Sequence, residues 1–222
     1  MDAASLAAVS VPGPDFFTRA RARLSLDVPA ALHDHAAAGR RGDLDLEPDL
    51  WERAGVQATR PAAVLIPVVD RPEPQVLLTQ RTELPSHPGQ IAFPGGKIDP
   101  QDESPAAAAM REAQEEIGLK RELIEPIGYL DLYLTFSGYR ILPMLARVRT
   151  SYRLTLCEAE VADAFEVPLA FLMNAQNHAL HSRDWKGIER RYYAMPFGER
   201  YIWGVTAGIV RNLYVRIYQQ AA

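Results

Sequence analysis

The chain has 222 residues, 48% hydrophobic and 23% charged, which is the composition of a globular protein with one substantial core. A formal net charge of −4 argues against general binding of nucleic acid, and without a long apolar run or a secretory pattern we expect a soluble, cytoplasmic protein that does not enter a membrane. The single cysteine, Cys157, excludes an internal disulfide and a multi-cysteine zinc site, and it is expected to be a buried small hydrophobe.

The first 60 residues are expected to form a helical extension ahead of one main domain, residues 61–222. Apolar residues at helical spacing predict an amphipathic helix over residues 14–26. A second short helix is expected around residues 30–38, followed by a turn-rich polar stretch over 39–43. The residues available to pack from the first helix are Phe16, Phe17, Ala20 and Leu24.

Short apolar runs bounded by turn residues predict the strands of the main domain. Strands are expected over residues 62–69, 75–81, 127–135 and 139–148, and a hairpin over 178–185 and 190–197. Helices are expected over residues 158–165 and, at the end of the chain, from about 204 to 218. Strands on both sides of a central helix, with another helix at the end, indicate an α+β domain with helices on two faces of a mixed sheet.

The central helix is predicted over residues 105–117. Ser104 is a good N-cap, Pro105 suits the first helical position, and Gly118 suits a left-handed C-terminal cap. At about 100° per residue, one arc of this helix is apolar and the neighbouring arc is acidic. The apolar arc consists of Ala106, Ala109, Met110, Ala113 and Ile117.

Three glutamates, Glu112, Glu115 and Glu116, share the acidic arc. Like charges this close repel by roughly a few tenths of a kcal/mol per pair, so helix stability alone disfavours the arrangement. A hard divalent cation removes that repulsion, and oxygen ligands without Cys or His select Mg²⁺ or Mn²⁺ over zinc. These three residues alone leave an ordinary solvated acidic face open as the alternative.

The segment around this helix resembles the Nudix box, the signature of the Nudix hydrolases. It consists of Gly96, a six-residue spacer, Glu103, seven further residues and the run Arg111–Leu119. The family's spacer normally has five residues, so Asp99-Pro100 is interpreted as a turn that absorbs the extra one. The resemblance implies the Nudix fold, an α/β/α sandwich with a mixed β-sheet. It also implies hydrolysis of a nucleoside diphosphate linked to another group.

Residues outside the box resemble the coenzyme A pyrophosphatase subgroup of that family. The resemblance implies hydrolysis of coenzyme A or its derivatives to 3′,5′-ADP and 4′-phosphopantetheine or acyl-phosphopantetheine. A Nudix pyrophosphatase of ADP-ribose, NADH or dinucleoside polyphosphates is the alternative. A catalytically silent, nucleotide-sensing domain is a further one, which the intact set of box glutamates disfavours. The resembling runs are Leu77–Thr82, Pro85–Gly96, Glu160–Leu169 and Ile202–Leu213.

The resemblance also implies roles for the charged residues. Glu112 and Glu116, one helical turn apart, would hold the principal Mg²⁺ or Mn²⁺, and Glu115 would help to hold another ion or orient the attacking water. Arg111 would orient the glutamates. For the general base we nominate Glu160, at the start of a predicted helix in a subgroup-like run.

The substrate is expected to be a small nucleotide of the coenzyme A type, and its contacts are expected from the run before the box. Coenzyme A carries a 3′-phosphate that requires a cationic partner, for which Arg81 is the first candidate and His87 the second. Gln90, Gly95 and Gly96 complete the predicted substrate-binding set. A homodimer stays open as the oligomeric state.

Overall fold

The computed structural model describes residues 13–34, 40–42, 45–46, 59–82, 89–185 and 188–219. Its central layer is a mixed β-sheet in which β2 (Arg60–Val69) and β8 (Tyr139–Val148) pair in parallel along their whole length. Antiparallel to β2 lies β3 (Gln75–Arg81), which also pairs with β9 (Val161–Pro168). Further strands of this sheet are β1 (Arg40–Gly42), β4 (Ile91–Ala92), β5 (Gly95–Lys97), β6 (Ile124–Tyr129) and β7 (Leu132–Leu134).

Both faces of the sheet are buried, and β2 shows why its sequence is an almost continuous apolar run. Ile66 and Val68 enter the core on one face, whereas Leu65 and Val69 enter the core on the other. Successive residues of a strand point to opposite faces of the sheet. Because a core covers each face, all four side chains are fully buried. A strand covered on both sides needs apolar residues at every position, as the predicted run over 62–69 has.

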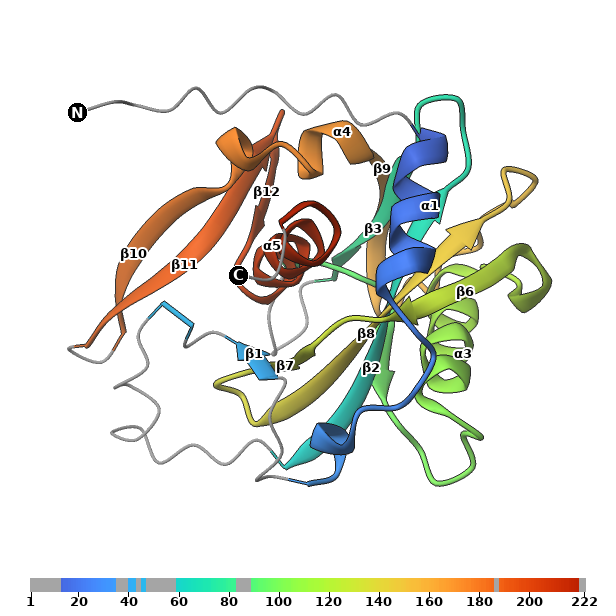
Figure 1. Cartoon of the computed structure of the whole chain (residues 1–222), viewed down its shortest axis with the longest axis horizontal. Helices are drawn as coiled ribbons and strands as arrows, with labels where there is room; N and C mark the ends of the chain where they lie inside the picture. Colours follow the sequence, from blue (N-terminus) through green and yellow to red (C-terminus); the bar gives the residue numbers. More distant parts are fainter. Residues whose placement is uncertain are drawn as a thin grey trace.

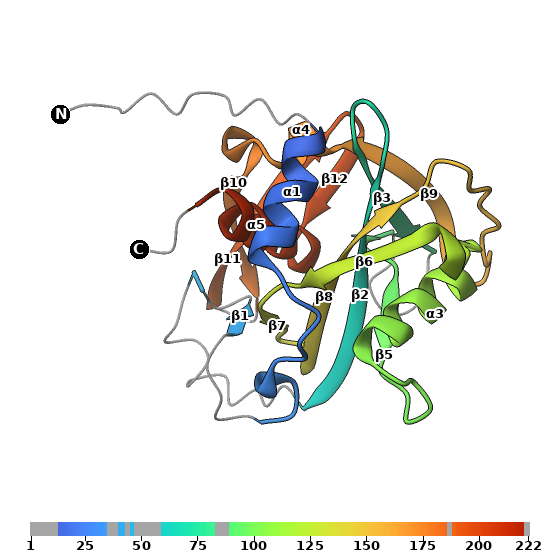
Figure 2. The same ribbon diagram turned by 45° about the vertical axis from the view of Figure 1, so that its right-hand side comes forward.

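Helices cover the two faces as expected. On one side of the sheet lies α3 (Pro105–Ile117), and on the other lie α1 (Gly13–Arg23) and α5 (Val205–Tyr218), as Figures 1 and 2 show. The predicted α+β architecture, an α/β/α sandwich around a mixed sheet, is therefore confirmed. The strands predicted over 75–81 and 139–148 and the helices over 105–117 and 204–218 are also confirmed, the last beginning at Val205.

The N-terminal helix packs into the same core as α5. Phe16, Phe17, Ala20 and Leu24 are all buried, as predicted, and belong to the core cluster that contains α5 residues. The helix expected around 30–38 is seen as a short 3₁₀ turn, η1 (Ala30–Leu32), and residues 35–39 lie outside the described part. The turn predicted over 39–43 is wrong for residues 40–42, which form β1 and pair in parallel with β7.

The helix predicted over residues 158–165 is wrong. Residues 158–160 form a turn, and Val161–Pro168 is strand β9, which runs antiparallel along β3. Pairing with β3 satisfies the backbone of both strands and buries Val161 and Val167, so tertiary context outweighs the local preference. Cys157, just before this turn, is half-buried, and its N–H donates to the carbonyl of Glu116 at 2.8 Å.

The strand expected over residues 127–135 is divided in two. β6 ends at Tyr129 and β7 begins at Leu132, and both pair antiparallel with β8. The register of β6 on β8 shifts between Pro126 and Gly128, which is an irregularity that bends the edge of the sheet.

The C-terminal part adds a second antiparallel sheet. The predicted hairpin is confirmed as β10 (Ala179–Trp185) and β11 (Ile188–Phe197), and β12 (Arg200–Trp203) extends it. No helix in the described ranges is long and apolar enough to cross a membrane. The short helical segments are η2 (Arg121–Leu123), α4 (Leu169–Leu172) and η3 (Ala175–Asn177).

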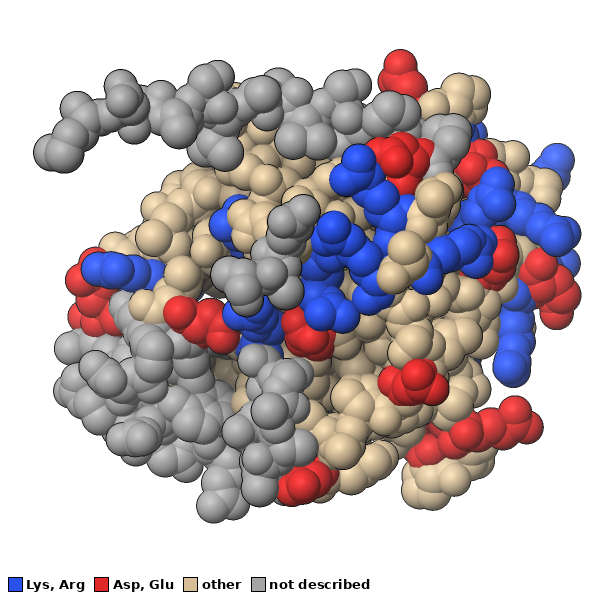
Figure 3. All heavy atoms as spheres, in the orientation of Figure 1, with Lys and Arg blue, Asp and Glu red and all other residues tan. Residues whose placement is uncertain are grey.

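Charge is unevenly distributed over this acidic chain. Figure 3 shows a band of Lys and Arg side chains across the face that carries α1 in Figure 1. On α1 these arginines have acidic partners, since Arg19 pairs with Asp15 at 2.7 Å and Arg21 with Glu125 at 2.8 Å. These two arginines are therefore neutralised by acidic neighbours.

Candidate active site

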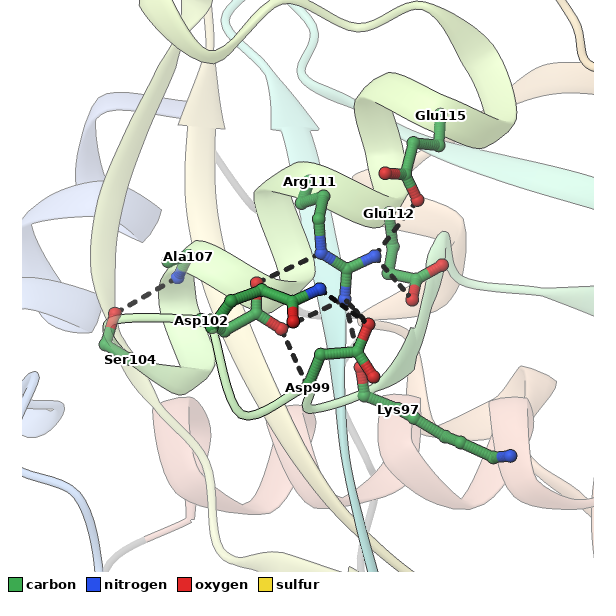
Figure 4. Close-up of polar contacts among 9 residues, drawn as sticks. Lys97, Asp99, Asp102, Ser104, Ala107, Arg111, Glu112 and Glu115 are labelled. Carbon is green, nitrogen blue, oxygen red and sulfur yellow. Dashed lines mark hydrogen bonds and ion pairs between the residues drawn. The ribbon is translucent and has the colours of Figure 1, made fainter.

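Both ends of α3 are held as its sequence predicts. The hydroxyl of Ser104 accepts a hydrogen bond from the N–H of Ala107 at 3.1 Å, drawn in Figure 4. Gly118 adopts the left-handed conformation at φ 69°, and its N–H bonds the last carbonyls of the helix. The helix is therefore fixed in length and register, which determines where its side chains point.

The buried face of α3 is wider than the apolar arc predicted for it. Ala109, Ala113 and Ile117 are fully buried as expected, but Ala108 is as well, whereas Ala106 is partly exposed. Glu116 is also buried, with 6% of its surface exposed. One glutamate of the acidic arc is thus inserted between α3 and the sheet, where β5 lies against the helix.

Arg111 is the centre of an ion-pair network, shown in Figure 4. Its Nε and one terminal nitrogen donate to the two oxygens of Asp102, each at 3.0 Å, in a bidentate pair. The other terminal nitrogen donates to Glu112 and Glu115, also at 3.0 Å each. Hydrogen bonding to Asp102 is the main cause that raises the pKa of Arg111. Arg111 therefore sets the orientation of two box glutamates, the placement expected for it.

Asp102 is a site residue that the sequence reasoning missed. Its side chain is 5% exposed, and the hydrogen bond from Arg111 lowers its pKa. Glu103, the predicted acidic position of the box, is exposed instead. Five residues, 97–101, separate Gly96 from Asp102, which is the family's usual spacing. That spacing was the signal that could have identified Asp102.

The turn that places Asp102 is the one predicted at Asp99-Pro100. The N–H of Asp102 donates to the carbonyl of Asp99 at 3.0 Å, and the Asp102 carboxylate accepts from the N–H of Asp99 at 2.8 Å. These paired bonds close a tight turn just before α3. The extra residue of the spacer is therefore accommodated between Asp102 and the helix, where Glu103 points to solvent.

Glu116 is held in an environment that disfavours its charge. Burial is the largest cause that raises its pKa to about 7, and the charges of Glu112 and Glu160 act in the same direction. Its hydrogen-bond donor among the described residues is the N–H of Gly95, at 3.3 Å. Arg81 lowers this pKa, so the Arg81 side chain lies close enough for its charge to act on Glu116.

Glu112 is half-buried and lies directly on β5. A Cβ added at Gly96 would lie 2.5 Å from a Glu112 carboxylate oxygen, so only glycine leaves room for this side chain. Burial raises the pKa of Glu112 more than the Arg111 contact lowers it. The repulsive charges that add to this are those of Glu115 and Glu160.

Glu115 and Glu160 lie on the exposed side of this group. The side chain of Glu115 is 60% exposed and pairs with Arg111. Glu160 is exposed in the turn before β9, where a helix was predicted. Its charge acts on both Glu112 and Glu116, so it faces the same site. The carbonyl of Glu160 accepts from Thr82, which fixes this turn beside the end of β3.

The predicted substrate residues are only partly placed together. Arg81 is at the end of β3, and its Nε is buried without a hydrogen-bond partner in the part of the chain that the structure describes. Gln90 accepts a hydrogen bond from the Arg81 N–H through its carbonyl, and it also lines a cavity beside α5. Gly95 and Gly96 form β5 against Glu116 and Glu112. His87 lies outside the described residues.

The donor set of this site suits a hard divalent cation. No three acidic, histidine or cysteine side chains form a ready-made metal cage in the described part of the chain. Arg111 and Gly95 each occupy one carboxylate oxygen, which leaves Glu112 Oε2 and Glu116 Oε1 without a hydrogen-bond partner among the described residues. A buried and a half-buried carboxylate that repel each other, each with a free oxygen, fit Mg²⁺ or Mn²⁺ chemically.

Comparisons with known proteins give one family match and several related proteins. A family model described as the NUDIX domain matches residues 59–189. An uncharacterized Nudix hydrolase, NudL, of Yersinia pestis (strain Pestoides F) is 41% identical over 157 residues, which cover 69% of this chain and 78% of that protein. NudL of Yersinia pseudotuberculosis serotype O:1b matches equally. A C. elegans Ap4A hydrolase structure is 23% identical, covers 49% of this chain and 80% of its own, and has a TM-score of 0.43.

Proposed function

The chain belongs to the Nudix hydrolase family and is thus a pyrophosphohydrolase, and we propose that its substrate is coenzyme A or a derivative of it. Water would cleave the diphosphate bond to give 3′,5′-ADP and 4′-phosphopantetheine, or acyl-phosphopantetheine from an acyl thioester. The observation that supports the reaction type is the repelling pair of half-buried Glu112, held by Arg111, and buried Glu116, held by Gly95. The substrate class is supported by the subgroup-like runs before and after the box.

Mg²⁺ or Mn²⁺ would be held by Glu112 and Glu116, with Glu115 available for a further ion. When bound, such an ion neutralises the diphosphate and lowers the pKa of its water. Together these effects stabilise the transition state by roughly several kcal/mol. Arg111, itself held by Asp102, fixes one oxygen of the Glu112 carboxylate, so that the other oxygen would be available to an ion.

The proton of the attacking water requires an acceptor near the carboxylates. Glu160 is exposed, acts electrostatically on Glu112 and Glu116, and has no other partner fixed by the described residues, so we assign it this role. Arg81 would receive a phosphate oxygen of the substrate, which is supported by its buried Nε having no hydrogen-bond partner among the described residues and by its charge acting on Glu116.

A substrate panel tests this proposal. With Mg²⁺ or Mn²⁺, coenzyme A should yield 3′,5′-ADP and 4′-phosphopantetheine, identified by mass spectrometry. The panel should also contain acyl-coenzyme A, ADP-ribose, NADH and dinucleoside polyphosphates. If ADP-ribose or NADH has a kcat/KM at least tenfold above that of coenzyme A, the assigned substrate is wrong.

Substitution of Arg81 tests whether it binds the 3′-phosphate. Hydrogen bonds to charged groups contribute about 1.5–3 kcal/mol, so Arg81→Ala should lower kcat/KM for coenzyme A by roughly ten- to a hundredfold. Dephospho-coenzyme A, which lacks that phosphate, should be affected much less. Arg121→Ala, on exposed η2, is the matched control. Equal losses on both substrates would show that Arg81 does not read the 3′-phosphate.

Metal binding can be measured without turnover. Protein freed of metal with EDTA should gain thermal stability when Mn²⁺ is added, because an ion that binds only the folded state stabilises it. Glu116→Gln should abolish most of that gain, whereas Glu103→Gln, at an exposed position, should retain it. A Glu116→Gln variant that responds to Mn²⁺ like the parent would exclude Glu116 as a ligand.

A further inference from the structure

Arg200 connects the C-terminal sheet to the sheet that carries the active site. It lies on β12, and its two terminal nitrogens donate to the side chains of Gln80 on β3 and Asp163 on β9. Its guanidinium also lies 4.3 Å from the centroid of the Phe165 ring on β9. The planar, forked guanidinium of arginine suits such a place, because it bonds two partners in fixed directions and stacks on aromatic rings. Arg200 therefore holds two neighbouring strands of the other sheet at once.

The two residues that Arg200 bonds form the last regular pair between β3 and β9. Gln80 and Asp163 lie directly opposite each other, and the register shifts immediately after Gln80. Arg81 consequently lies opposite Val161, and β9 has one extra residue between Val161 and Asp163. A bulge of this kind redirects the side chains around it and is frequent beside active sites. Here Arg81 follows the bulge on β3 and Glu160 comes just before it on β9, so the placement of both depends on its geometry.

Arg200 acts from the face of the sheet opposite the carboxylates of α3. Leu78, which shares a face with Gln80, packs in the core of α1 and α5, whereas Leu77, which shares a face with Arg81, packs in the core of α3. A hold on Gln80 from one face therefore fixes the backbone from which Arg81 extends on the other. Arg81 depends on that backbone, because its buried Nε has no hydrogen-bond partner among the described residues.

The turn that carries Glu160 is tied to the same end of β3. The N–H of Thr82 donates to the carbonyl of Glu160 at 3.1 Å, and the Thr82 hydroxyl donates to the carbonyl of Ala159 at 3.2 Å. These bonds join the residue after Arg81 to the turn before β9. A shift of either strand at the bulge would therefore move Glu160 and Arg81 together.

We propose that Arg200 is a positioning residue for the hydrolysis. By bonding Gln80 and Asp163, it keeps the bulge between β3 and β9 in one geometry. That geometry directs Arg81 and Glu160 toward the carboxylates of α3. Arg200 acts through these two residues and not through the substrate. The inference rests on the roles proposed above for Arg81 and Glu160, but it does not depend on which diphosphate is the substrate.

The first test uses whichever diphosphate of the substrate panel is hydrolysed best. Arg200→Ala should lower kcat/KM at least tenfold, because a displacement of catalytic groups by about 1 Å costs roughly a hundredfold. Arg19→Ala is the matched control and should retain the kcat/KM of the parent. Arg19 also pairs with an acid, Asp15, and lies 5.7 Å from the centroid of the Tyr218 ring, but it is on α1. A loss below tenfold in Arg200→Ala, or an equal loss in Arg19→Ala, would overturn the proposal.

Double variants separate positioning from a general loss of stability. The factor lost on Arg200→Ala should shrink at least threefold in an Arg81→Ala or a Glu160→Gln background, because residues that act through one another are not additive. A merely structural role predicts the same factor in every background, and shrinkage below threefold in both would overturn the proposal. The single variants Arg81→Ala and Glu160→Gln test the proposed function itself, so its failure is seen separately. Should Arg200→Ala fail to fold, Asp163→Asn, which removes the charged partner of Arg200, replaces it with the same expected results.

Discussion

At the scale of single residues, Glu116 couples stability to pH. Its pKa is raised from 4.5 to about 7 in the folded protein, so the folded state binds the proton more tightly. The stability associated with this group is fully present below pH 4.5 and is lost as the pH rises through about 7. That shift corresponds to about 3 kcal/mol.

Glu116→Gln should therefore be more stable than the parent by up to about 3 kcal/mol at pH 8 in EDTA, with a much smaller difference at pH 5. Urea unfolding across this pH range measures the gap. Its kcat should fall about a thousandfold with Mg²⁺ if the charge contributes about 4 kcal/mol to the transition state. A stability gap that does not change with pH would contradict the assigned burial of the charge.

Asp102 gives a second prediction at this scale. Asp102→Asn removes the charged partner of a bidentate, almost fully covered pair with Arg111, so it should destabilise the protein by about 2 kcal/mol. Glu103→Gln, next to it but exposed, should change stability by less than about 0.5 kcal/mol. Thermal melts of the two variants compare them directly, and similar melting temperatures would show that Asp102 is not the structural partner.

At the scale of elements, the contact between β5 and α3 brings the carboxylates to the sheet. Gly96 lies against the Glu112 carboxylate, and Gly95 donates to Glu116. Gly96→Ala would displace Glu112, the flexible end of a side chain, so the loss of stability should be small. The displacement should still lower kcat/KM at least tenfold, because catalytic groups must keep their position closely.

The matched control for Gly96→Ala is Gly118→Ala. Gly118 has φ 69°, and its added Cβ would meet the backbone of Thr155 at 3.0 Å and none of the carboxylates. Gly118→Ala should destabilise the protein by about 1 kcal/mol or more, while the folded fraction keeps near-normal kcat/KM. Gly96→Ala should therefore lower kcat/KM more than Gly118→Ala does, whereas Gly118→Ala should lower the melting temperature more. Full activity in Gly96→Ala would refute the importance of this contact.

At the scale of the whole molecule, the first helix is joined to the catalytic fold through a shared core. Phe16 is fully buried and packs in the cluster that includes α5 and one face of the sheet. Phe16→Ala should destabilise the protein by about 3–5 kcal/mol, the range for a large buried aromatic residue. Leu26→Ala, at a position 49% exposed, is the control and should have little effect. Denaturant unfolding would contradict the shared core if Phe16→Ala formed a separate, earlier transition.

Local sequence signals were sufficient for the framework of the fold and for much of the site. The caps of α3, the apolar runs of β2, β3 and β8, and the Arg111–Leu119 run all depend on neighbours within a few residues, where spacing and propensity act directly. Helical spacing within that run is enough to group Glu112, Glu115 and Glu116 in one candidate site. Their periodicity shows that they share a helix face, but it does not show how deeply each lies.

Tertiary structure decided what depends on partners far along the chain. Residues 158–165 have a local preference for helix. Val161–Pro168 nevertheless forms strand β9, because it pairs with the backbone of β3. The burial of Glu116 and its raised pKa arise only because β5 lies on α3. The cavity beside α5 is lined by residues as far apart in the sequence as Arg41 and Asn212. Periodicity reports the direction of a side chain on its own element, whereas burial and charge depend on which other element packs against it.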